Sequence, residues 1–415
     1  MTSDLEYDAS EEDFEGILGS FSEDSVSAQC SLQFQPWHRP HKQYVRDNMW
    51  IRETINLLRD LYGRELQDLS KVVSGGSIRY LTLPGNDCLD IRAMGPRVYD
   101  LFHLKLLWYG FDVESNKNKT LLQSKIFELK RKPYIDKNSN TYYCDIRVIG
   151  RKLNDRVRNE NTNYVLEDFK KQPPFDIINL DLCANLACKH RHISQYGTNY
   201  FAVIESVLIK QSKRNKKSLL FVTTKMDSDS AEHEDAVKLQ KLAQEVFDRC
   251  RDYADSFVKC WGANGAEDCK LQDYASYEEH FMLGVTQWII RQAISCRLKP
   301  KVKSFMVYHT GVFDGEDDIV SFAIELSPVS SLQVDASGLI ESPDMFNAQN
   351  LEDKVSSVVP CRVFNRIHVD AVLGDDKEEM TKCIDSTKAL LEEVGYDTDA
   401  YEKWLLEEKT ASQRL

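Results

Sequence analysis

The sequence contains no apolar run of the roughly 18 residues that a membrane-spanning helix needs, so we expect no membrane contact. Its N-terminal stretch has neither the basic nor the apolar region of a secretory signal. The 11 cysteines show no framework-like spacing, which is typical of reduced thiols rather than of a disulfide scaffold. Together these absences predict a cytoplasmic protein.

Familiar catalytic motifs are also missing. The sequence has no P-loop, no HExxH and no GxSxG element. Its net charge of −13 argues against a general nucleic-acid coat, because phosphate binding needs clustered lysine and arginine. What is present is a chain of 415 residues with 42% hydrophobic content, which is enough to bury one large core or two moderate ones.

The clearest local signal is the apolar run at residues 175–183. Two apolar pairs lead into Asn179 and Asp181, and Pro173 and Pro174 come just before them. A short apolar run that is bounded by breakers and ends in an acid predicts a buried parallel strand. Ligands bind at the carboxyl ends of such strands in open α/β sheets. We therefore expect Asn179 and Asp181 beside a cleft, as candidate catalytic residues.

Further strands and helices are predicted on both sides of this run. Apolar patterning predicts strands at 79–83, 142–146, 219–224, 304–309 and 320–326, the end of a strand at 111–114, and a short strand near 363–369. Helical periodicity predicts helices at 42–62, 97–107, 117–132, 200–211, 236–254, 277–294 and 377–409. Alternating strands and helices followed by a hairpin predict an α/β fold. We expect a doubly wound, mostly parallel seven-stranded sheet with a C-terminal antiparallel hairpin and helical extensions at both ends.

Charge and composition divide the chain into four segments. Residues 1–34 carry many acids but no lysine or arginine, which predicts a disordered acidic tail. A helical segment at 35–74, an α/β domain at 75–330 and a C-terminal extension with acidic helices at 331–415 follow. The tail is expected to be either solvated or a docking element for another protein subunit.

Basic residues gather in three runs, at 117–132, 147–158 and 210–217. Such runs are solvated faces or parts of one nucleic-acid-binding groove, and the sequence leaves both interpretations open. A cluster of Cys183, Cys188, His190 and His192 holds enough soft ligands for zinc, but its spacing is not that of a known finger. We therefore predict no metal site there.

The order of elements between residues 75 and 328 resembles a class I S-adenosylmethionine-dependent methyltransferase. That fold has a doubly wound sheet whose last strand is antiparallel, so its last two strands form a hairpin. The resemblance implies S-adenosylmethionine as cofactor and places residues 82–86 in the cofactor loop. It implies cofactor-binding roles for Gly85 and Asn86 in that loop, for Asp112 or Glu114 at the ribose and for Asp145 near the adenine, and catalytic roles for Asn179 and Asp181.

The sequence also departs from that family. Its loop holds one glycine, Gly85, although the family has two or three so that the backbone can approach the cofactor. Pro84 removes a backbone donor beside it. Amino-methylating members have two prolines and an aromatic ring after the fourth strand, where this chain has Asp181-Leu182-Cys183. These departures predict a catalytically degenerate protein and argue against an adenine or cytosine amino-methyltransferase.

Three functional hypotheses follow. The run at 178–183 resembles bacterial proteins of this fold from phage-defence gene neighbourhoods, which implies a degenerate methyltransferase-like subunit of a bacterial multi-protein complex. The second hypothesis is an active methyltransferase that acts on nucleic acid or protein, with Asp181 orienting the acceptor. The third is a non-enzymatic nucleic-acid sensor that uses the three basic runs.

Overall fold

The centre of the protein is one sheet, whose strands have the order β3-β2-β1-β4-β5-β7-β6-β8. The computed structural model describes residues 33–63, 76–113, 119–150, 160–188, 198–229, 231–263, 269–310, 318–329 and 347–412. Within these residues the strands are β1 (Ser77–Thr82), β2 (Lys105–Phe111), β3 (Asn140–Tyr142), β4 (Ile177–Asn185), β5 (Ser218–Lys225), β6 (Leu298–Tyr308), β7 (Ile319–Pro328) and β8 (Ile367–His368). The predicted acidic tail lies almost entirely outside them.

The strand directions confirm the predicted doubly wound α/β fold. Strands β1 to β5 pair in parallel, whereas β7 is antiparallel to both β5 and β6 and so forms the expected hairpin. The chain moves outward from β1 to β2 and β3 on one side and from β4 to β5 on the other. The order therefore reverses between β1 and β4, and such a switch point is where α/β sheets bind ligands. The C-terminal extension adds β8 as an eighth strand, paired with Met306 and Val307.

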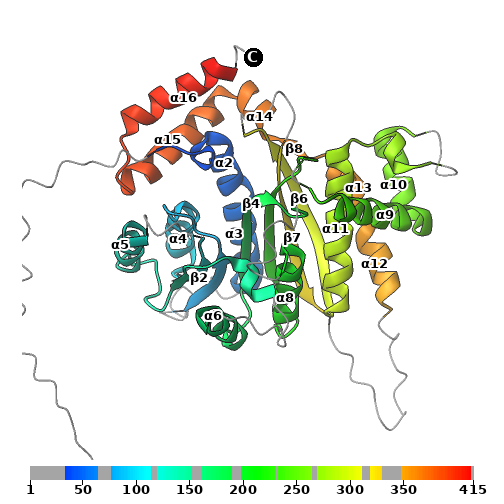
Figure 1. The fold of residues 1–415 in the computed structure, drawn as a ribbon, viewed down its shortest axis with the longest axis horizontal. Coiled ribbons are helices and arrows are strands. Elements are labelled where there is room, and N and C mark those ends of the chain that lie inside the picture. The colour runs from blue at the N-terminus through cyan, green and yellow to red at the C-terminus, as the bar shows by residue number, and fades with distance from the viewer. Residues whose placement is uncertain are drawn as a thin grey trace, which may run out of the picture. The chain divides into compact units, whose positions relative to one another are not determined.

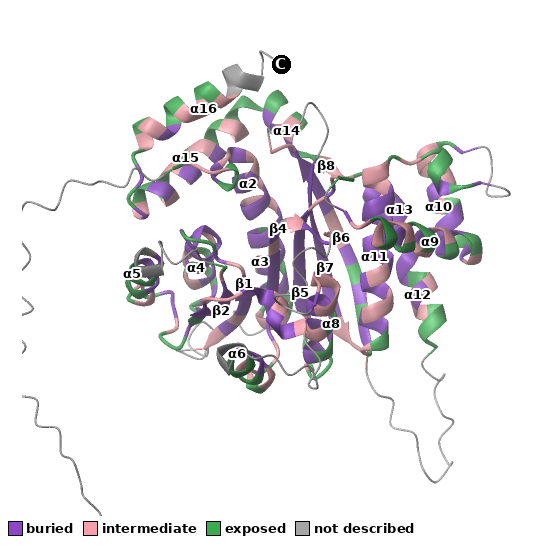
Figure 2. Ribbon diagram, viewed as in Figure 1, coloured by how far each residue is buried: buried purple, intermediate pink, exposed green. Residues whose placement is uncertain are grey.

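Alternating side chains bury the sheet on both faces. In β4, Ile178 and Leu180 enter one hydrophobic core and Ile177 enters the other. In β5, Leu220 enters the first of these cores and Leu219 enters the second. Figure 2 shows these central strands as buried along most of their length. A continuous apolar run rather than an alternating one is what a parallel sheet covered on both faces requires.

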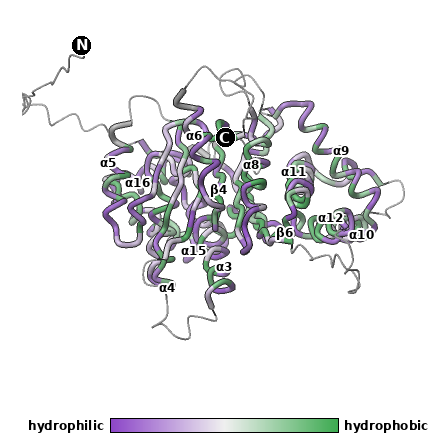
Figure 3. The backbone as a smooth tube through the Cα atoms, turned by 90° about the horizontal axis from the view of Figure 1, so that it is seen from below, coloured by the Kyte–Doolittle hydropathy of each residue, from purple (hydrophilic) through white to green (hydrophobic). Residues whose placement is uncertain are grey.

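Helices cover both faces of this sheet (Figure 1). The first core contains side chains of α6 (Glu160–Lys171), α8 (Tyr200–Gln211), α9 (His233–Arg249), α10 (Arg251–Trp261), α11 (Tyr277–Ser295), α12 (Ala348–Ser356) and α13 (Val359–Phe364). The second contains side chains of α2 (Pro40–Val45), η3 (Arg46–Ile51), α3 (Arg52–Tyr62), α4 (Leu89–Phe102), α5 (Lys119–Lys130), α14 (Val369–Asp375) and α15 (Lys377–Glu393). Figure 3 shows α9, α10, α11 and α12 grouped beside β6.

The terminal segments pack onto the central sheet rather than forming separate bodies. Pro36–Leu415 form one compact unit, which includes the predicted N-terminal helical segment and the C-terminal extension. Helix α15 packs against α2 and α4, and α16 (Thr398–Ser412) packs against α15 (Figure 1). Three short 3₁₀ turns complete the described structure: η2 (Pro36–His38), η5 (Ile146–Gly150) and η7 (Leu271–Asp273).

Several predicted boundaries were wrong. The helix expected at 97–107 is α4, which ends at Phe102 because His103 adopts a left-handed conformation; β2 then begins at Lys105. Helix α4 starts at Leu89, eight residues before the expected Arg97, so Pro96 lies inside the helix. The helix expected at 236–254 is two helices, because Cys250 is extended between α9 and α10. The strand expected at 142–146 ends at Tyr142 and is followed by η5.

Two helical glycines provide a matched test of the packing. A Cβ at Gly284 of α11 would lie 2.7 Å from the carbonyl oxygen of Leu239, whereas a Cβ at Gly374 of α14 would meet no described atom within 4 Å. We expect Gly284→Ala to lower the free energy of unfolding by about 1–3 kcal/mol through overpacking. Gly374→Ala should raise it by about 0.5–1 kcal/mol, because alanine loses less backbone entropy than glycine. Urea denaturation measures both, and equal shifts would contradict the close approach of α9 to α11.

Candidate functional site

A cavity of about 680 Å³ lies at the carboxyl ends of the central strands, beside the switch point between β1 and β4. Its wall includes residues from the ends of β1, β2, β4, β5 and β6, and the N-terminal segment at 36–50 closes one side. Volumes of about 300–1,000 Å³ are typical of small-molecule sites. The position and size together make this cavity the candidate ligand site.

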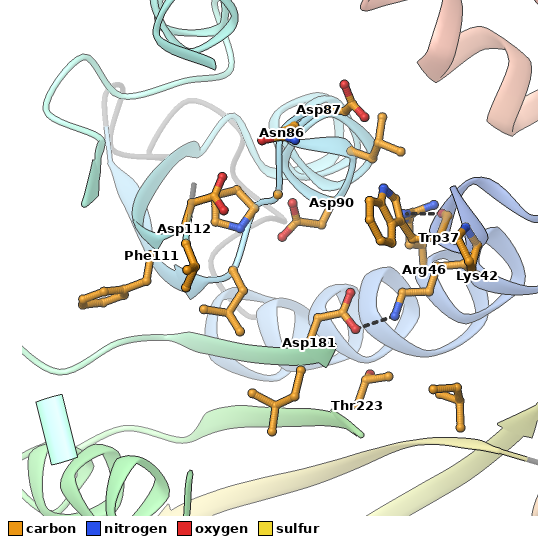
Figure 4. Close-up of a pocket in the computed structure, with 18 of the residues that line it drawn as sticks. Trp37, Lys42, Arg46, Asn86, Asp87, Asp90, Phe111, Asp112, Asp181 and Thr223 are labelled. Carbon is orange, nitrogen blue, oxygen red and sulfur yellow. Dashed lines mark hydrogen bonds and ion pairs between the residues drawn. The ribbon is translucent and has the colours of Figure 1, made fainter. Parts of the chain in front are cut away.

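The structure brings most of the sequence-predicted site residues to this one cavity. Its lining includes Gly85, Asn86, Asp112, Asp145 and Asp181. Figure 4 shows Asp112 and Asp181 on different sides of the same space. These residues come from four different segments of the chain, so their convergence is a property of the fold and not of any local motif.

Two predicted residues do not join them. Asn179 is fully buried within the sheet and is not part of the cavity lining. Its side-chain amide donates to the Tyr80 hydroxyl at 3.1 Å, which places it beneath the cavity as a support. Glu114, the alternative to Asp112, lies outside the described residues.

The loop after β1 makes a tight turn at Gly85. This glycine has φ of +60°, in the left-handed region that glycine adopts without steric cost. Cys88 is also left-handed and directly precedes α4, which begins at Leu89. The turn therefore points the start of α4 at the cavity, and Asp87 and Asp90 become part of the lining.

Asp90 is a buried carboxyl group on the first turn of α4. The Tyr80 hydroxyl (2.7 Å) and the Thr82 hydroxyl (2.5 Å) both donate to its Oδ2 atom. Its Oδ1 atom is buried and has no hydrogen-bond partner among the described residues. Burial raises the pKa of Asp90 above its usual value, because the charged form is poorly solvated. An unpartnered buried acceptor is rare in proteins and calls for a donor, such as a water molecule or a ligand group.

The N-terminal helix contributes three cavity residues that the sequence analysis did not predict. Lys42, Arg46 and Trp50 recur at every fourth position of a helix that runs continuously through α2, η3 and α3. Its middle part, η3, is a π-helical turn, a geometry that is frequent at functional sites. The only sequence signal was two cations and a tryptophan on one helical stripe, a pattern that is equally typical of an ordinary packed helix.

Lys42 forms a buried ion pair with the predicted catalytic acid. Its Nζ atom lies 2.5 Å from Oδ1 of Asp181, donates to the Tyr308 hydroxyl at 3.3 Å, and lies 4.9 Å from the centre of the Trp50 ring. Burial opposes the charge of Lys42, but the carboxylate of Asp181 prevails and raises the pKa of the amine. The cavity end of β4 is therefore held by a charged lysine (Figure 4).

Arg46 lies one turn further along the same helix. Its terminal nitrogens donate to Oε1 of Gln43 at 3.3 Å and to the Trp37 carbonyl at 3.2 Å. Its Nε atom is buried without a partner, and no described carboxylate lies within ion-pair distance. Burial lowers the pKa of Arg46, but an arginine keeps its charge at neutral pH. The cavity wall thus contains a guanidinium group that forms no ion pair with a described carboxylate, although the charges of Asp181 and Asp90 support its ionisation from a greater distance.

Asp145 is occupied by its neighbour on η5. Its carboxylate accepts two hydrogen bonds from Nε of Arg147 at 3.0 Å and one from Nη2 at 2.7 Å, so the pair is bidentate. The guanidinium of Arg147 also lies 5.4 Å from the centre of the Tyr200 ring. Because its carboxylate is already paired, Asp145 can shape the cavity more readily than it can bind a ligand donor.

Asp87 is the centre of a buried network that supports the cavity. Its carboxylate accepts hydrogen bonds from Nε2 of His38 (3.1 Å), from Nζ of Lys125 (2.5 Å) and from the hydroxyl of Tyr396 (3.1 Å). Burial opposes ionisation of Asp87, but the hydrogen bond from His38 and the charge of Lys125 lower its pKa to about 2. Burial also lowers the pKa of His38, which is therefore neutral near pH 7. The counter-charge of Asp87 is Lys125.

The described cations of the three basic runs are mostly engaged within the protein. In the first run, Lys125 pairs with Asp87 and Lys132 pairs with Glu393. Arg147 of the second run pairs with Asp145, as described above. In the third run, Arg214 pairs with Asp176, Lys217 with Glu325, and buried Lys210 donates to the carbonyls of Lys170 and Gln172. Residues 151–159 of the second run lie outside the described residues.

The predicted absence of a zinc site stays a prediction. His190 and His192 lie outside the described residues, and the side chain of Cys183 is not described either. Elsewhere, within the part of the chain that the structure describes, no group of three or more histidine, cysteine or acidic residues is placed to hold a metal ion. None of the described helices has the length and apolar character needed to cross a bilayer.

Comparison with known proteins defines the family. A family model described as PP_RS20740-like matches residues 31–406. The chain therefore belongs to the PP_RS20740-like family. No curated protein matches the sequence. The matched region includes both the N-terminal helix that carries Lys42 and Arg46 and the C-terminal segment that carries Tyr396.

The Asp87 network predicts a large effect of one isosteric substitution. Asp87→Asn leaves the charge of Lys125 buried without its counter-ion, so we expect the free energy of unfolding to fall by about 3 kcal/mol or more. Asp100→Asn, at an exposed position of helix α4, which begins just after Asp87, should change it by less than about 0.5 kcal/mol. Adding Lys125→Met to Asp87→Asn should restore part of the loss. Urea denaturation of the four proteins measures this, and equal stabilities would contradict the network.

The same carboxylate predicts a dependence of stability on pH. The pKa of Asp87 is about 2 in the folded protein against 3.8 ordinarily, so the unfolded chain binds the proton first as the pH falls. Its contribution, about 2 kcal/mol, is fully present above about pH 4 and is lost as the pH falls from about 4 to 2. The wild-type protein should lose more stability over this window than Asp87→Asn does. An equal loss of unfolding free energy in the wild-type protein and in Asp87→Asn over this pH window would contradict the prediction.

Proposed function

We propose that this protein is a class I methyltransferase-like protein that binds S-adenosylmethionine in the switch-point cavity and works as a catalytically degenerate subunit of a protein complex. The cavity lies where the resemblance implied the cofactor, at the carboxyl ends of β1, β2 and β4. The hairpin of β6 and β7 lies beside β5, as in that fold. When bound, S-adenosylmethionine supplies an electrophilic methyl group.

The adenosine end of the ligand would lie toward β2. Asp112 follows the last residue of β2 and lines the cavity together with Phe111 and Val113. A carboxylate at this point can accept hydrogen bonds from both ribose hydroxyl groups, and charge-assisted hydrogen bonds of this kind are among the stronger ones. The apolar side chains of Phe111 and Ile146 add surface for a base, since both also line the cavity.

The observation that carries the proposal concerns the part of the cavity that would hold the amino-acid end of S-adenosylmethionine. Two cavity-lining residues each have a buried polar atom with no partner among the described residues: Nε of Arg46, a donor, and Oδ1 of Asp90, an acceptor. A zwitterionic amino acid has the complementary groups, because its carboxylate suits the guanidinium and its ammonium suits the carboxylate. Satisfying both would remove two desolvation penalties. An adenosine-linked amino acid therefore fits the residues present better than a simple nucleoside does.

The ion pair between Lys42 and Asp181 favours the degenerate form of the proposal. In an active enzyme, Asp181 would orient the acceptor or take its proton. Here one of its oxygens is held by a buried lysine, so its charge is already neutralised at the point where an acceptor would bind. Binding without methyl transfer is the outcome that this arrangement supports.

Calorimetry with two ligands tests the proposed binding mode. We expect micromolar affinity for S-adenosylmethionine. Asp112→Asn should weaken both S-adenosylmethionine and 5′-methylthioadenosine by about tenfold or more, because both contain the ribose. Arg46→Met should weaken S-adenosylmethionine by a similar factor but leave 5′-methylthioadenosine, which lacks the amino acid, unchanged.

Asp100→Ala is the matched control, since Asp100 is exposed on α4 and does not line the cavity. Each variant is first checked for an unchanged thermal unfolding transition. Absence of heat with the folded wild-type protein would overturn the proposal. Equal losses for both ligands in Arg46→Met would overturn the amino-acid assignment alone.

A transfer assay separates the degenerate form from an active enzyme. The protein is incubated with methyl-labelled S-adenosylmethionine and with nucleic-acid and protein fractions of a cell extract. We expect the label to remain in the bound cofactor, with no S-adenosylhomocysteine formed above the rate of a Lys42→Met, Asp181→Asn control. Transfer of label that depends on Asp181 would show that the protein is an active methyltransferase instead.

A further inference from the structure

Two thiols that do not line the switch-point cavity lie in contact with each other. Cys260, near the end of α10, and Cys361, in α13, have their sulfur atoms 3.0 Å apart, although the residues are separated by 101 positions in the sequence. Both cysteines are free and only partly buried. Their separation is far below that of unrelated buried cysteines, which normally pack as small apolar residues.

The surroundings of the two thiols differ. The hydroxyl of Ser256 donates to the Cys361 sulfur at 3.3 Å, so Cys361 is hydrogen-bonded by a group that favours its thiolate. Burial opposes ionisation, but the contacts with Cys260 and Ser256 and the charges of Lys259 and Arg362 lower the pKa of Cys361 below its usual value. Burial and the neighbouring thiol raise the pKa of Cys260 to about 12. Cys361 therefore ionises more readily than an ordinary thiol, whereas Cys260 stays protonated beside it.

A second cavity gives small reactants access to Cys361. This cavity, also of about 680 Å³, is lined by Cys361 and Ser256 together with side chains from α3, β6 and α13. Three of the lining residues are cations, namely Arg52, Lys303 and Arg362, against one acid in the same wall, Glu53, which pairs with Lys303 and Arg52. An electropositive, solvent-accessible setting is what distinguishes reactive cysteines from buried structural ones. By contrast, Cys88 and Cys383 are almost fully buried and burial raises both of their pKa values.

We propose that Cys260 and Cys361 form a reversible, peroxide-sensitive disulfide that joins α10 to α13. The Cys361 thiolate attacks one oxygen of hydrogen peroxide; the S–O bond forms, the O–O bond breaks and the departing hydroxide takes a proton to give water. The sulfur of Cys260 then attacks the sulfur of the resulting sulfenic acid. The S–S bond forms, the S–O bond breaks, and a second water leaves. Two thiols lose two electrons in total, and one peroxide is reduced to two waters.

The bond would connect two helices of the first core that pack against each other but continue into different parts of the structure. Helix α10 belongs to the cluster of α9, α10 and α11, whereas α13 leads directly into β8 at the edge of the sheet and into α14 against α2. A disulfide between them would close a long loop, which restricts the unfolded chain and so raises stability. Oxidation would therefore attach α13, which directly precedes β8 and α14, covalently to α10.

The full-length reduced protein is exposed to a small molar excess of hydrogen peroxide, alkylated and analysed by peptide mass spectrometry. We expect a link between Cys260 and Cys361 that accounts for two lost alkylation sites and is reversed by dithiothreitol. Cys361 should react at least about tenfold faster than Cys383, the buried control thiol. The oxidised protein should also unfold at a temperature about 2 °C or more higher.

Two serine variants give different results if the assignment holds. Cys260→Ser should accumulate a sulfenic acid on Cys361 that dimedone traps, because the second thiol is missing. Cys361→Ser should lose the fast reaction altogether, and Cys383→Ser should behave as the wild-type protein does. A link between other cysteines, or equal reactivity of Cys361 and Cys383 in the folded protein, would overturn the proposal.

Discussion

One buried carboxylate holds together four parts of the chain that are remote in sequence. Asp87 receives hydrogen bonds from the N-terminal turn η2, from α5, and from the segment between α15 and α16, while it lies itself in the loop after β1. A buried charge is stable only when its partners are complete. The loop that shapes the cavity and the helices that flank it are therefore positioned together rather than independently.

The central strands could be predicted from the sequence more reliably than the ends of the helices. Residues 175–183 predict a buried strand because a parallel strand covered on both faces must be apolar throughout, and β4 is such a strand. Helix ends depend on single backbone conformations instead. The left-handed residues Cys88 and His103 set the bounds of α4, and neither is a glycine that would mark the position in the sequence.

Two acids of the site could be predicted from the apolar runs they end, although Asp112 follows β2 whereas Asp181 lies inside β4. Asp112 and Asp181 were found because each ends an apolar run, and both line the cavity. Asn179 lies on the same face of β4 as Asp181, but two residues further from the carboxyl end and paired with β1, where its amide donates to the Tyr80 hydroxyl. Lys42 and Arg46 lie 35 and 31 residues before the start of β1 at Ser77, and only tertiary packing brings them to the strand ends. No local pattern encodes that packing.

The hydrogen bond from Tyr396 to Asp87 has a consequence for synthesis of the protein. Asp87, His38 and Lys125 leave the ribosome long before Tyr396, which lies 309 positions after Asp87. The set of hydrogen bonds to Asp87, which lines the cavity, cannot be completed until nearly the whole chain has been translated. A nascent chain that stalls in the C-terminal helices therefore has its strands but not the finished wall of the cavity.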